Sequence, residues 1–202
     1  MEARGETHAA EEGNISEARA REDAALMARV QRGDEPARGA LMDRWELPVK
    51  SVIGRIVLNA GEAEELAQET FVRVWQQREK FRAGAAFRPW VFSIAVNLAR
   101  NRLRWWRRRP TVSLDGWSET PGEGPEAKGE GAEALERGER AAAVRDAIAA
   151  LPVELREAIV LFEYERLSHA EIAEVVGATA KAVETRIYRA REKLRVVLVR
   201  WG

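Results

Sequence analysis

The chain has 202 residues, of which 46% are hydrophobic and 33% are charged, and its 33 basic side chains equal its 33 acidic ones. That length suits one or two small domains, and the apolar fraction is large enough to supply each with a core. No cysteine is present and the two histidines, His8 and His169, are isolated. This excludes disulfides, thiolate metal sites and a zinc site built by this chain alone, so we expect neither a metal nor a cofactor.

Residues 1–22 are polar, rich in Ala, Glu and Arg, and without a sustained apolar period. They predict a flexible or marginally helical N-terminal arm. Carboxylates stand here where a signal peptide would have a basic and then an apolar run, and no uncharged apolar stretch approaches the roughly 18 residues that span a bilayer. We expect a cytoplasmic protein with no direct membrane insertion.

Helical apolar spacing dominates residues 23–110 and predicts a first domain of successive helices. Apolar runs over 26–30, 37–45 and 49–57 precede a further helix over 62–77. A last helix begins near Pro89 and extends to about Trp106, with an apolar stripe beside a polar one. The polar stripe comprises Ser93, Asn97, Arg100, Asn101 and Arg104.

The segment before this last helix, residues 81–87, is a short loop that contains Gly84 and is flanked by aromatic side chains. Such a loop can accept an unstacked base, because aromatic and arginine side chains stack on bases. A core position is nevertheless favoured over base stacking for the four aromatic residues here, which are Phe81, Phe87, Trp90 and Phe92.

Residues 111–139 contain two prolines, several glycines and many carboxylates, but almost no large apolar side chain. No core can form from such a sequence, and an unstructured gap of this length is unusual inside one compact domain. We therefore predict an all-α protein in which a flexible acidic linker joins two small helical domains. The second domain covers 140–202, where helical spacing returns and no alternating strand pattern appears.

Two short helices joined at a glycine are predicted in this second domain. Ser168 and Glu171 have the spacing of a capping box, Gly177 is suited to end the first helix, and Thr179 to cap the second. Helical spacing predicts an inward apolar stripe on the second helix, made of Val183, Ile187, Ala190 and Leu194. The pattern is that of a helix-turn-helix whose basic second helix suits a major groove.

Charge is strongly segregated along the chain. Residues 71–110 carry 11 basic side chains and 1 acidic one, and residues 178–202 carry 7 and 2, whereas residues 111–177 carry 6 and 15. The arginine run from Arg100 to Arg109 has no acidic neighbour in sequence, so a merely solvated face would suffer like-charge repulsion that a phosphate partner relieves. Two basic surfaces separated by an acidic stretch predict local contacts with a polyanion.

Together, these segments resemble the extracytoplasmic-function sigma factors over about 23–109 and 140–196. Three motifs carry the resemblance in this order: the helix Glu64–Trp75, the segment Phe81–Asn97 with its Phe-Arg and Phe-Arg-Pro-Trp pieces, and Leu151-Pro152 followed by the helix-turn-helix. The resemblance implies a dissociable subunit of bacterial RNA polymerase. Such a subunit directs the core enzyme to specific promoters, promotes DNA melting at initiation, and is not itself an enzyme.

The same resemblance implies roles for individual residues. Binding to the clamp helices of core polymerase is implied for Glu65, Gln68 and Glu69, with the second domain on the flap. Binding to the melted minus-10 element is implied for Arg82, Gly84, Arg88, Asn97, Arg100, Asn101 and Arg104. Contacts with the minus-35 element are implied for Thr179, Lys181, Glu184, Thr185, Arg186 and Arg189. Association with the nucleoid during initiation and an anti-sigma factor as a further partner are also implied.

Two details of these implied sites are expectations of their own. The stripe that contains Arg100 and Asn101 is expected to face away from the helix that docks on polymerase. At position 184 this chain has a glutamate where many relatives carry a small or basic residue. The base sequence of the minus-35 element that it recognises is therefore not predicted.

Other function classes fit the sequence less well. A helix-turn-helix repressor or activator that binds duplex operators without polymerase leaves the arginine-rich helix and the aromatic loop unexplained. An RNA-binding or nucleoid protein held by charge alone would show steep salt dependence without sequence preference. An enzyme with a small-molecule substrate is disfavoured, because we find no Gly-rich phosphate loop, nucleophile arrangement or catalytic carboxylate pair.

Overall fold

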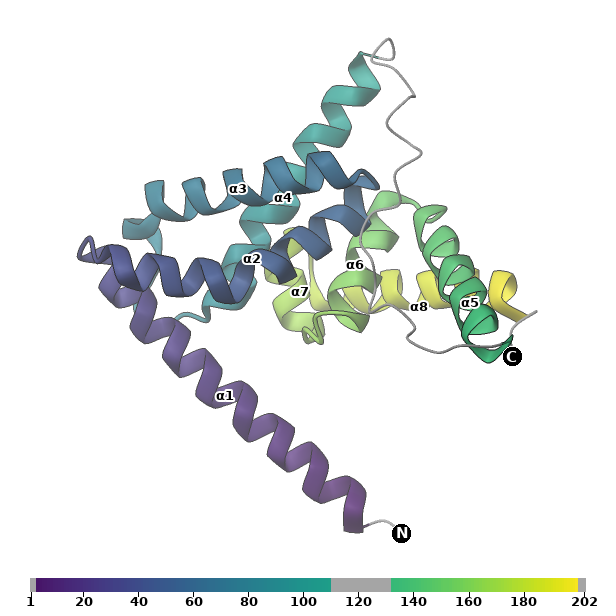
Figure 1. The fold of residues 1–202 in the computed structure, drawn as a ribbon, viewed down its shortest axis with the longest axis horizontal. Coiled ribbons are helices and arrows are strands. Elements are labelled where there is room, and N and C mark those ends of the chain that lie inside the picture. The colour runs from purple at the N-terminus through teal and green to yellow at the C-terminus, as the bar shows by residue number, and fades with distance from the viewer. Residues whose placement is uncertain (1–2, 110–131, 200–202) are drawn as a thin grey trace.

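The computed structural model describes residues 3–109 and 132–199, and every regular element in these ranges is helical (Figure 1). A first region comprises α1–α4 and a second region α5–α8. The elements are α1 (Ala3–Gln31), α2 (Glu35–Val57), α3 (Ala60–Gln76), the short 3-10 helix η1 (Arg78–Lys80), α4 (Phe87–Arg108), α5 (Ala132–Ala149), α6 (Val153–Glu163), α7 (His169–Val176) and α8 (Ala180–Leu198). The all-α prediction is confirmed.

Local sequence signals set the ends of α2 and α3. Asp34 caps α2 by accepting a hydrogen bond from the Ala37 N–H at 3.0 Å, and Asn59 caps α3 by accepting one from the Glu62 N–H at 2.9 Å. Between them, Leu58 takes a left-handed conformation with a φ of 60°, which ends α2. Such caps satisfy N–H groups that have no partner within the first helical turn.

We expect Asn59→Ala to lower the free energy of unfolding by about 1 kcal/mol, because the N-terminus of α3 loses its cap. Urea-induced unfolding followed by circular dichroism measures this change. Asn59→Asp keeps an acceptor at the same position and should stay close to the parent protein. Equal losses in the two variants would show that the cap is not the cause.

Helix α2 runs unbroken through Pro48, whereas the sequence pattern predicted separate runs over 37–45 and 49–57. Proline removes one backbone N–H and crowds the preceding turn. The helix is anchored on both sides of it, however, since Leu41 and Val49 are buried. Packing of the two flanks outweighs the local cost.

Two other boundaries differ from the sequence prediction. Helix α1 begins at Ala3, inside the segment predicted to be a flexible or marginally helical arm, and α5 begins at Ala132, inside the expected linker of 111–139. Both stretches are rich in Ala, Glu and Arg, which have high helix propensity. The remainder of the predicted linker lies outside the described residues.

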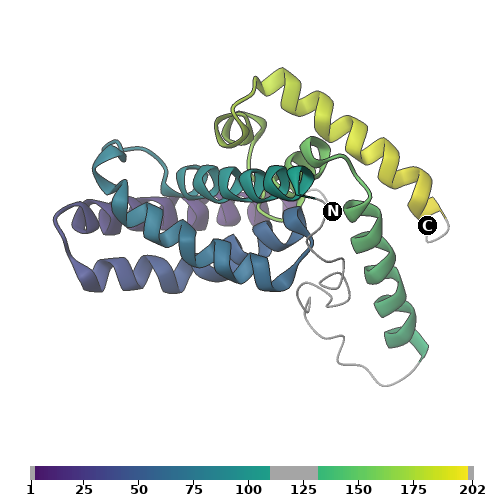
Figure 2. The ribbon, with the colours of Figure 1, turned by 90° about the horizontal axis from the view of Figure 1, so that it is seen from above.

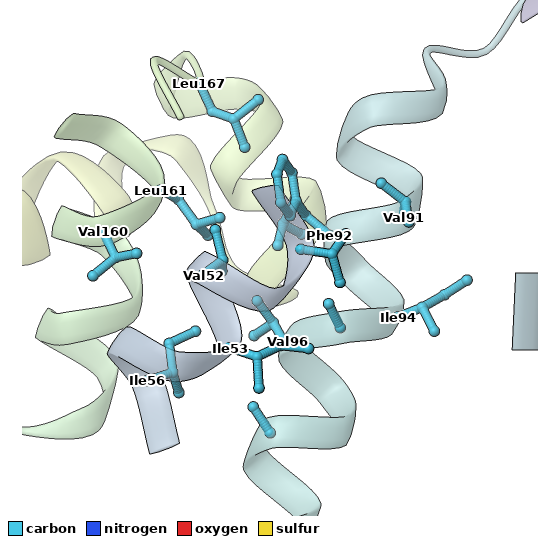
Figure 3. Packing of buried hydrophobic residues seen from close by; sticks show 14 of the residues in the cluster. Val52, Ile53, Ile56, Val91, Phe92, Ile94, Val96, Val160, Leu161 and Leu167 are labelled. Atoms are coloured by element: carbon cyan, nitrogen blue, oxygen red, sulfur yellow. The ribbon is translucent and has the colours of Figure 1, made fainter. Parts of the chain in front are cut away.

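Buried apolar side chains from both regions form one cluster. Figure 3 shows Ile53 and Ile56 of α2, Phe92 of α4 and Leu161 of α6 in this shared core. Helix α4 packs against α7, and α2 packs against α6. The sequence predicted two separate cores, and the regions meet because α4 buries every apolar side chain from Val91 to Ala99, not one stripe alone.

Helix α8 lies on the outer side of the second region. Figure 2 shows α6 and α7 between α8 and the first region, and α8 packs on α5, α6 and α7. The two basic helices α4 and α8 therefore do not share one surface. No helix in the described part of the chain is long and apolar enough to cross a membrane.

Candidate nucleic-acid interface

The loop between η1 and α4 is shaped by a tight turn and an aromatic cluster. The Ala85 N–H donates to the Arg82 carbonyl at 3.1 Å, and Gly84 has a φ of 79°, in the left-handed region that favours glycine. Phe81 and Phe87 are buried, with ring centroids 6.3 Å apart. The preference for a core position over base stacking is confirmed for both rings. The exposed residues of the loop are Arg82, Ala83, Gly84 and Ala86.

Most side chains predicted to bind the minus-10 element lie on the surface of this loop and of α4. The exposed ones are Arg82, Gly84, Asn97, Asn101 and Arg104. Arg88 and Arg100 are only partly exposed, because the second region covers them. The structure therefore divides the predicted set into open and covered residues.

Arg100 of α4 joins the two regions through three hydrogen bonds. Its Nε and Nη2 donate to the two carboxylate oxygens of Glu157 at 2.7 and 2.6 Å, and its Nη1 donates to the Val176 carbonyl at 3.1 Å. Glu157 is fully buried in α6. The hydrogen bonds to Glu157 raise the pKa of the Arg100 guanidinium above its ordinary value, against the opposing effect of burial.

A second arginine, which is buried, joins the regions through backbone groups. Arg156 of α6 donates to the carbonyls of Ile56 at 2.8 Å and Leu151 at 2.9 Å, and it also donates to the Ala149 carbonyl. Ile56 and Ala149 lie at the C-terminal ends of α2 and α5, where unpaired carbonyls and the helix dipole favour a cation. Burial lowers the pKa of Arg156.

A third inter-region contact surrounds Glu165. Its carboxylate lies 3.9 Å from the Arg88 guanidinium, and the neighbouring Tyr164 ring lies under the Arg55 guanidinium at 4.1 Å from the ring centroid. Burial raises the pKa of the Glu165 carboxyl, and the nearby charges of Arg88 and Arg55 only partly oppose this.

A raised pKa means that the folded state binds more protons than the unfolded state, so this group's contribution to stability falls as pH rises through its folded pKa. We expect Glu165→Gln to be more stable than the parent at neutral pH, with a difference that shrinks on acidification. Urea unfolding from about pH 8 down to about pH 5 measures it. Glu163→Gln, which breaks an ion pair inside the second region, is the comparison. A pH-independent difference for Glu165→Gln would contradict the assignment.

Two arginines of the run on α4 have acidic neighbours in space, which corrects part of the expectation drawn from sequence. Arg102 pairs with Glu62 and Glu65 of α3, and Arg100 pairs with Glu157. These carboxylates come from other helices, so the sequence around the arginine run did not reveal them. Repulsion along α4 is therefore relieved in part without a phosphate.

A groove of about 540 Å³ lies between α3 and the C-terminal half of α4. Glu69, which was predicted to bind polymerase, and Asn101, which was predicted to bind DNA, both line it, together with Trp105 and Trp106. The expectation that the whole DNA stripe faces away from α3 is wrong for Asn101. Helix α4 turns by 100° per residue, so Asn101 points away from the Arg100 side toward α3.

The predicted polymerase-binding residues lie together on α3. Glu65 and Gln68 are exposed, and Glu69 is partly exposed. The Gln68 amide donates to Glu64 at 3.3 Å, and Arg73 donates to Glu69 at 2.7 Å. These contacts are local and on the surface, so the three side chains remain accessible to a partner.

The helix-turn-helix is confirmed in detail. Ser168 and Glu171 form a reciprocal capping box, with the Ser168 N–H donating to the Glu171 carboxylate at 2.8 Å and the Glu171 N–H donating to the Ser168 hydroxyl at 3.2 Å. Gly177 ends α7 with a φ of 66°, and the Thr179 hydroxyl caps α8 by accepting from the Ala182 N–H at 3.2 Å. In the predicted apolar stripe of α8, Leu194 is partly buried and the other three residues are fully buried: Val183, Ile187 and Ala190.

The predicted minus-35 residues line one side of α8. Thr179, Lys181, Glu184 and Arg189 are exposed, and Thr185 and Arg186 are partly exposed. Lys181 donates to the Glu184 carboxylate at 2.9 Å, which lowers the pKa of that carboxyl. Glu184 therefore offsets part of the positive charge of the helix that the sequence assigns to DNA.

Three residues that the predicted site set omitted matter for this geometry. Tyr188 lies on α8 with 66% of its surface exposed. In the sequence, an aromatic residue among basic ones on the second helix could have marked it as a site residue. Glu157 and Arg156 connect the regions. The sequence indicated them only weakly, as two adjacent charges directly before the apolar run 158–161, which is completely buried in the structure.

Known proteins match both regions. The sigma-70 region 2 family matches residues 41–109, and the sigma-70 region 4 family matches residues 141–194. The RNA polymerase sigma-H factor of Pseudomonas aeruginosa is 36% identical over 183 residues, which cover 86% of this chain and 92% of that relative. The ECF RNA polymerase sigma-E factor of Salmonella typhimurium is 34% identical over 177 residues, covering 85% and 92%. The chain belongs to the extracytoplasmic-function sigma factors of the sigma-70 family.

The architecture of this sigma factor agrees with a solved structure over both regions. CnrH, solved in complex with the cytosolic domain of CnrY, superposes with a TM-score of 0.65 at 27% identity, covering 90% of this chain and 99% of that one. Region 2 of the sigma factor lies on α2–α4, and region 4 lies on α5–α8.

Proposed function

We propose that this sigma factor binds core RNA polymerase, directs it to specific promoters and promotes DNA melting at initiation. The observation that carries this function is the pairing of two basic helices, α4 in region 2 and α8 in region 4, each with an exposed polar face on a well-packed scaffold. The sigma factor has no catalytic role of its own.

Helix α4 and the loop before it bind the melted minus-10 element. Arginine supplies phosphate contacts and stacking, and asparagine hydrogen-bonds to base edges. Capture of unpaired bases offsets the cost of unpairing, at about 1–3 kcal/mol per stacked base. The side chains in this role are Arg82, Arg88, Asn97, Arg100, Asn101 and Arg104, with Gly84 providing the backbone turn.

Helix α8 enters the major groove of the minus-35 element. Its capping by Thr179 and its buried stripe fix the orientation of the exposed face. Lys181 and Arg186 hold phosphates, while Thr185 and Arg189 contact base edges. Glu184 accepts from a cytosine amino group or limits which sequences are tolerated.

Core polymerase contacts both regions. Glu65, Gln68 and Glu69 of α3 dock on its clamp helices, and region 4 binds its flap. Two modest DNA sites reinforce each other only when the polymerase fixes their separation, so the free protein binds promoters weakly. An anti-sigma factor is a further partner.

Run-off transcription with purified core polymerase and a library of promoter fragments tests this function, together with permanganate detection of unpaired thymines. We expect transcripts that require both proteins and a melted bubble near the start site. Tight binding to duplex operators without polymerase-dependent opening would instead favour a repressor or activator.

Asn97→Ala should slow open-complex formation about tenfold, because an exposed amide of α4 no longer holds an unpaired base, while affinity for core polymerase stays unchanged. Permanganate reactivity over time measures opening, and a binding titration measures affinity. Gln76→Ala, which removes an exposed amide from α3, is the control. If opening and core affinity fall together in Asn97→Ala, its place on DNA is wrong.

A further inference from the structure

The guanidinium of Arg100 is held by region 4 in the geometry that it would use for a phosphate. Two of its nitrogens bind the two oxygens of one carboxylate at 2.7 and 2.6 Å. Arginine forms this two-pronged contact with carboxylate and phosphate groups alike. Glu157 thus offers Arg100 the same pair of acceptor oxygens that a nucleic-acid backbone offers.

Region 4 surrounds the guanidinium with further negative potential. The third contact of Arg100 is the carbonyl of Val176, the last residue of α7, at 3.1 Å. Free carbonyls at the C-terminus of a helix carry the negative end of its dipole. A buried carboxylate and a helix C-terminus therefore converge on one cation.

This contact exists only while the two regions are packed together. Glu157 is fully buried, and a buried carboxylate without a cation is strongly destabilising. Separation of the regions would place Glu157 in water and release Arg100. Region 4 also lies over a second arginine of the same helix, since Arg88 is only partly exposed and its guanidinium lies 3.9 Å from the Glu165 carboxylate.

We infer that Glu157 occupies Arg100 in place of a DNA phosphate, so that packing of region 4 on α4 and capture of single-stranded DNA by α4 exclude each other. The competition with DNA rests on the function proposed for α4. The free sigma factor then holds part of its own minus-10 surface closed, without another protein. The apparent DNA affinity equals the affinity of the open form multiplied by the fraction of molecules that are open.

Spin-label distances in the full chain test this closure directly. The chain has no cysteine, so Val72→Cys and Val196→Cys introduce the only two labelling sites, on the exposed surfaces of α3 and α8. We expect a short, narrow distance distribution in the parent and a longer, broader one in Glu157→Gln. The matched control is Glu163→Gln, which removes a carboxylate from the same helix but breaks an ion pair with Arg191 inside region 4; it should match the parent.

DNA competition is measured on the same proteins with a mixed-sequence pool of single strands about 20 nucleotides long. The pool should lengthen the distances in the parent, and Glu157→Gln should bind it about tenfold more tightly than the parent or Glu163→Gln. Opening without tighter binding would overturn the competition. Identical distances in Glu157→Gln and Glu163→Gln would overturn the closure itself.

Arg100→Gln removes the partly exposed partner of the same pair. It is the alternative variant if Glu157→Gln does not fold. It should open the chain as judged by the label distances, and an unchanged distribution would overturn the inference. The distances report closure whether or not the protein directs transcription. Loss of the proposed function would appear separately, as failure of the parent protein in run-off transcription.

Discussion

Replacing Phe92 with alanine should lower the free energy of unfolding by about 3–5 kcal/mol, the largest stability loss that we expect from one substitution in this sigma factor. Phe92 is fully buried, and its ring meets Trp45 edge-on with centroids 5.9 Å apart. It belongs to the core that α2, α4 and α6 share (Figure 3). A cavity at this point removes contacts with several helices that cannot all move inward.

Urea-induced unfolding followed by circular dichroism measures this loss. Phe92→Leu keeps most of the side-chain volume, so its free energy of unfolding should fall clearly less than that of Phe92→Ala. Val72→Ala truncates a side chain that is 53% exposed and should stay within about 0.5 kcal/mol of the parent. If Phe92→Ala behaved like Val72→Ala, the shared core would not be as tightly packed as the structure indicates.

The helix-turn-helix was predictable from sequence because its geometry is set locally. The capping box joins Ser168 to Glu171, and the Thr179 cap reaches only to Ala182. A glycine at the end of α7 supplies the left-handed conformation that other residues rarely adopt. Interactions that close within three or four residues can be read from the order of residue types.

The inter-region contacts were not predictable in this way. Arg100 and Glu157 are 57 positions apart, and the carbonyls that bind Arg156 come from the ends of two other helices. Nothing in the sequence near Arg100 specifies which carboxylate relieves its charge. The sequence therefore predicted that a phosphate partner relieves the repulsion along the run, whereas the fold provides acidic partners for Arg100 and Arg102.

The side of α4 that each polar residue faces was predicted only in part. Asn97 and Arg104 are exposed, as expected for DNA contacts. Arg100 and Asn101 are adjacent in sequence, yet one pairs with α6 and the other lines the groove beside α3. A broad polar stripe on a helix can meet two different neighbours, and only the packing of the other helices decides which residue meets which.

Arg189→Ala should reduce transcription from promoters that depend on the minus-35 element by about tenfold to a hundredfold, as expected for loss of 1–3 kcal/mol at one arginine–base contact. Arg189 is exposed on α8, whose orientation is fixed by the buried side chains of Val183, Ile187 and Ala190. The substitution therefore removes a recognition group and leaves the scaffold intact. Run-off transcription on matched promoters, with the minus-35 element intact or scrambled, measures the loss.

Arg191→Ala is the control that separates recognition from charge. Arg191 lies two residues further along α8. Its side chain donates to Glu163 at 2.7 Å and stacks on the Phe162 ring at 5.0 Å from the centroid, so it points toward α6. Both variants lose one positive charge from the same helix. Recognition by Arg189 predicts a large loss for Arg189→Ala, a small loss for Arg191→Ala, and no further loss for Arg189→Ala on the scrambled promoter. Equal losses in both variants on both promoters would mean that α8 contributes only charge, and the assignment of Arg189 to a base edge would fail.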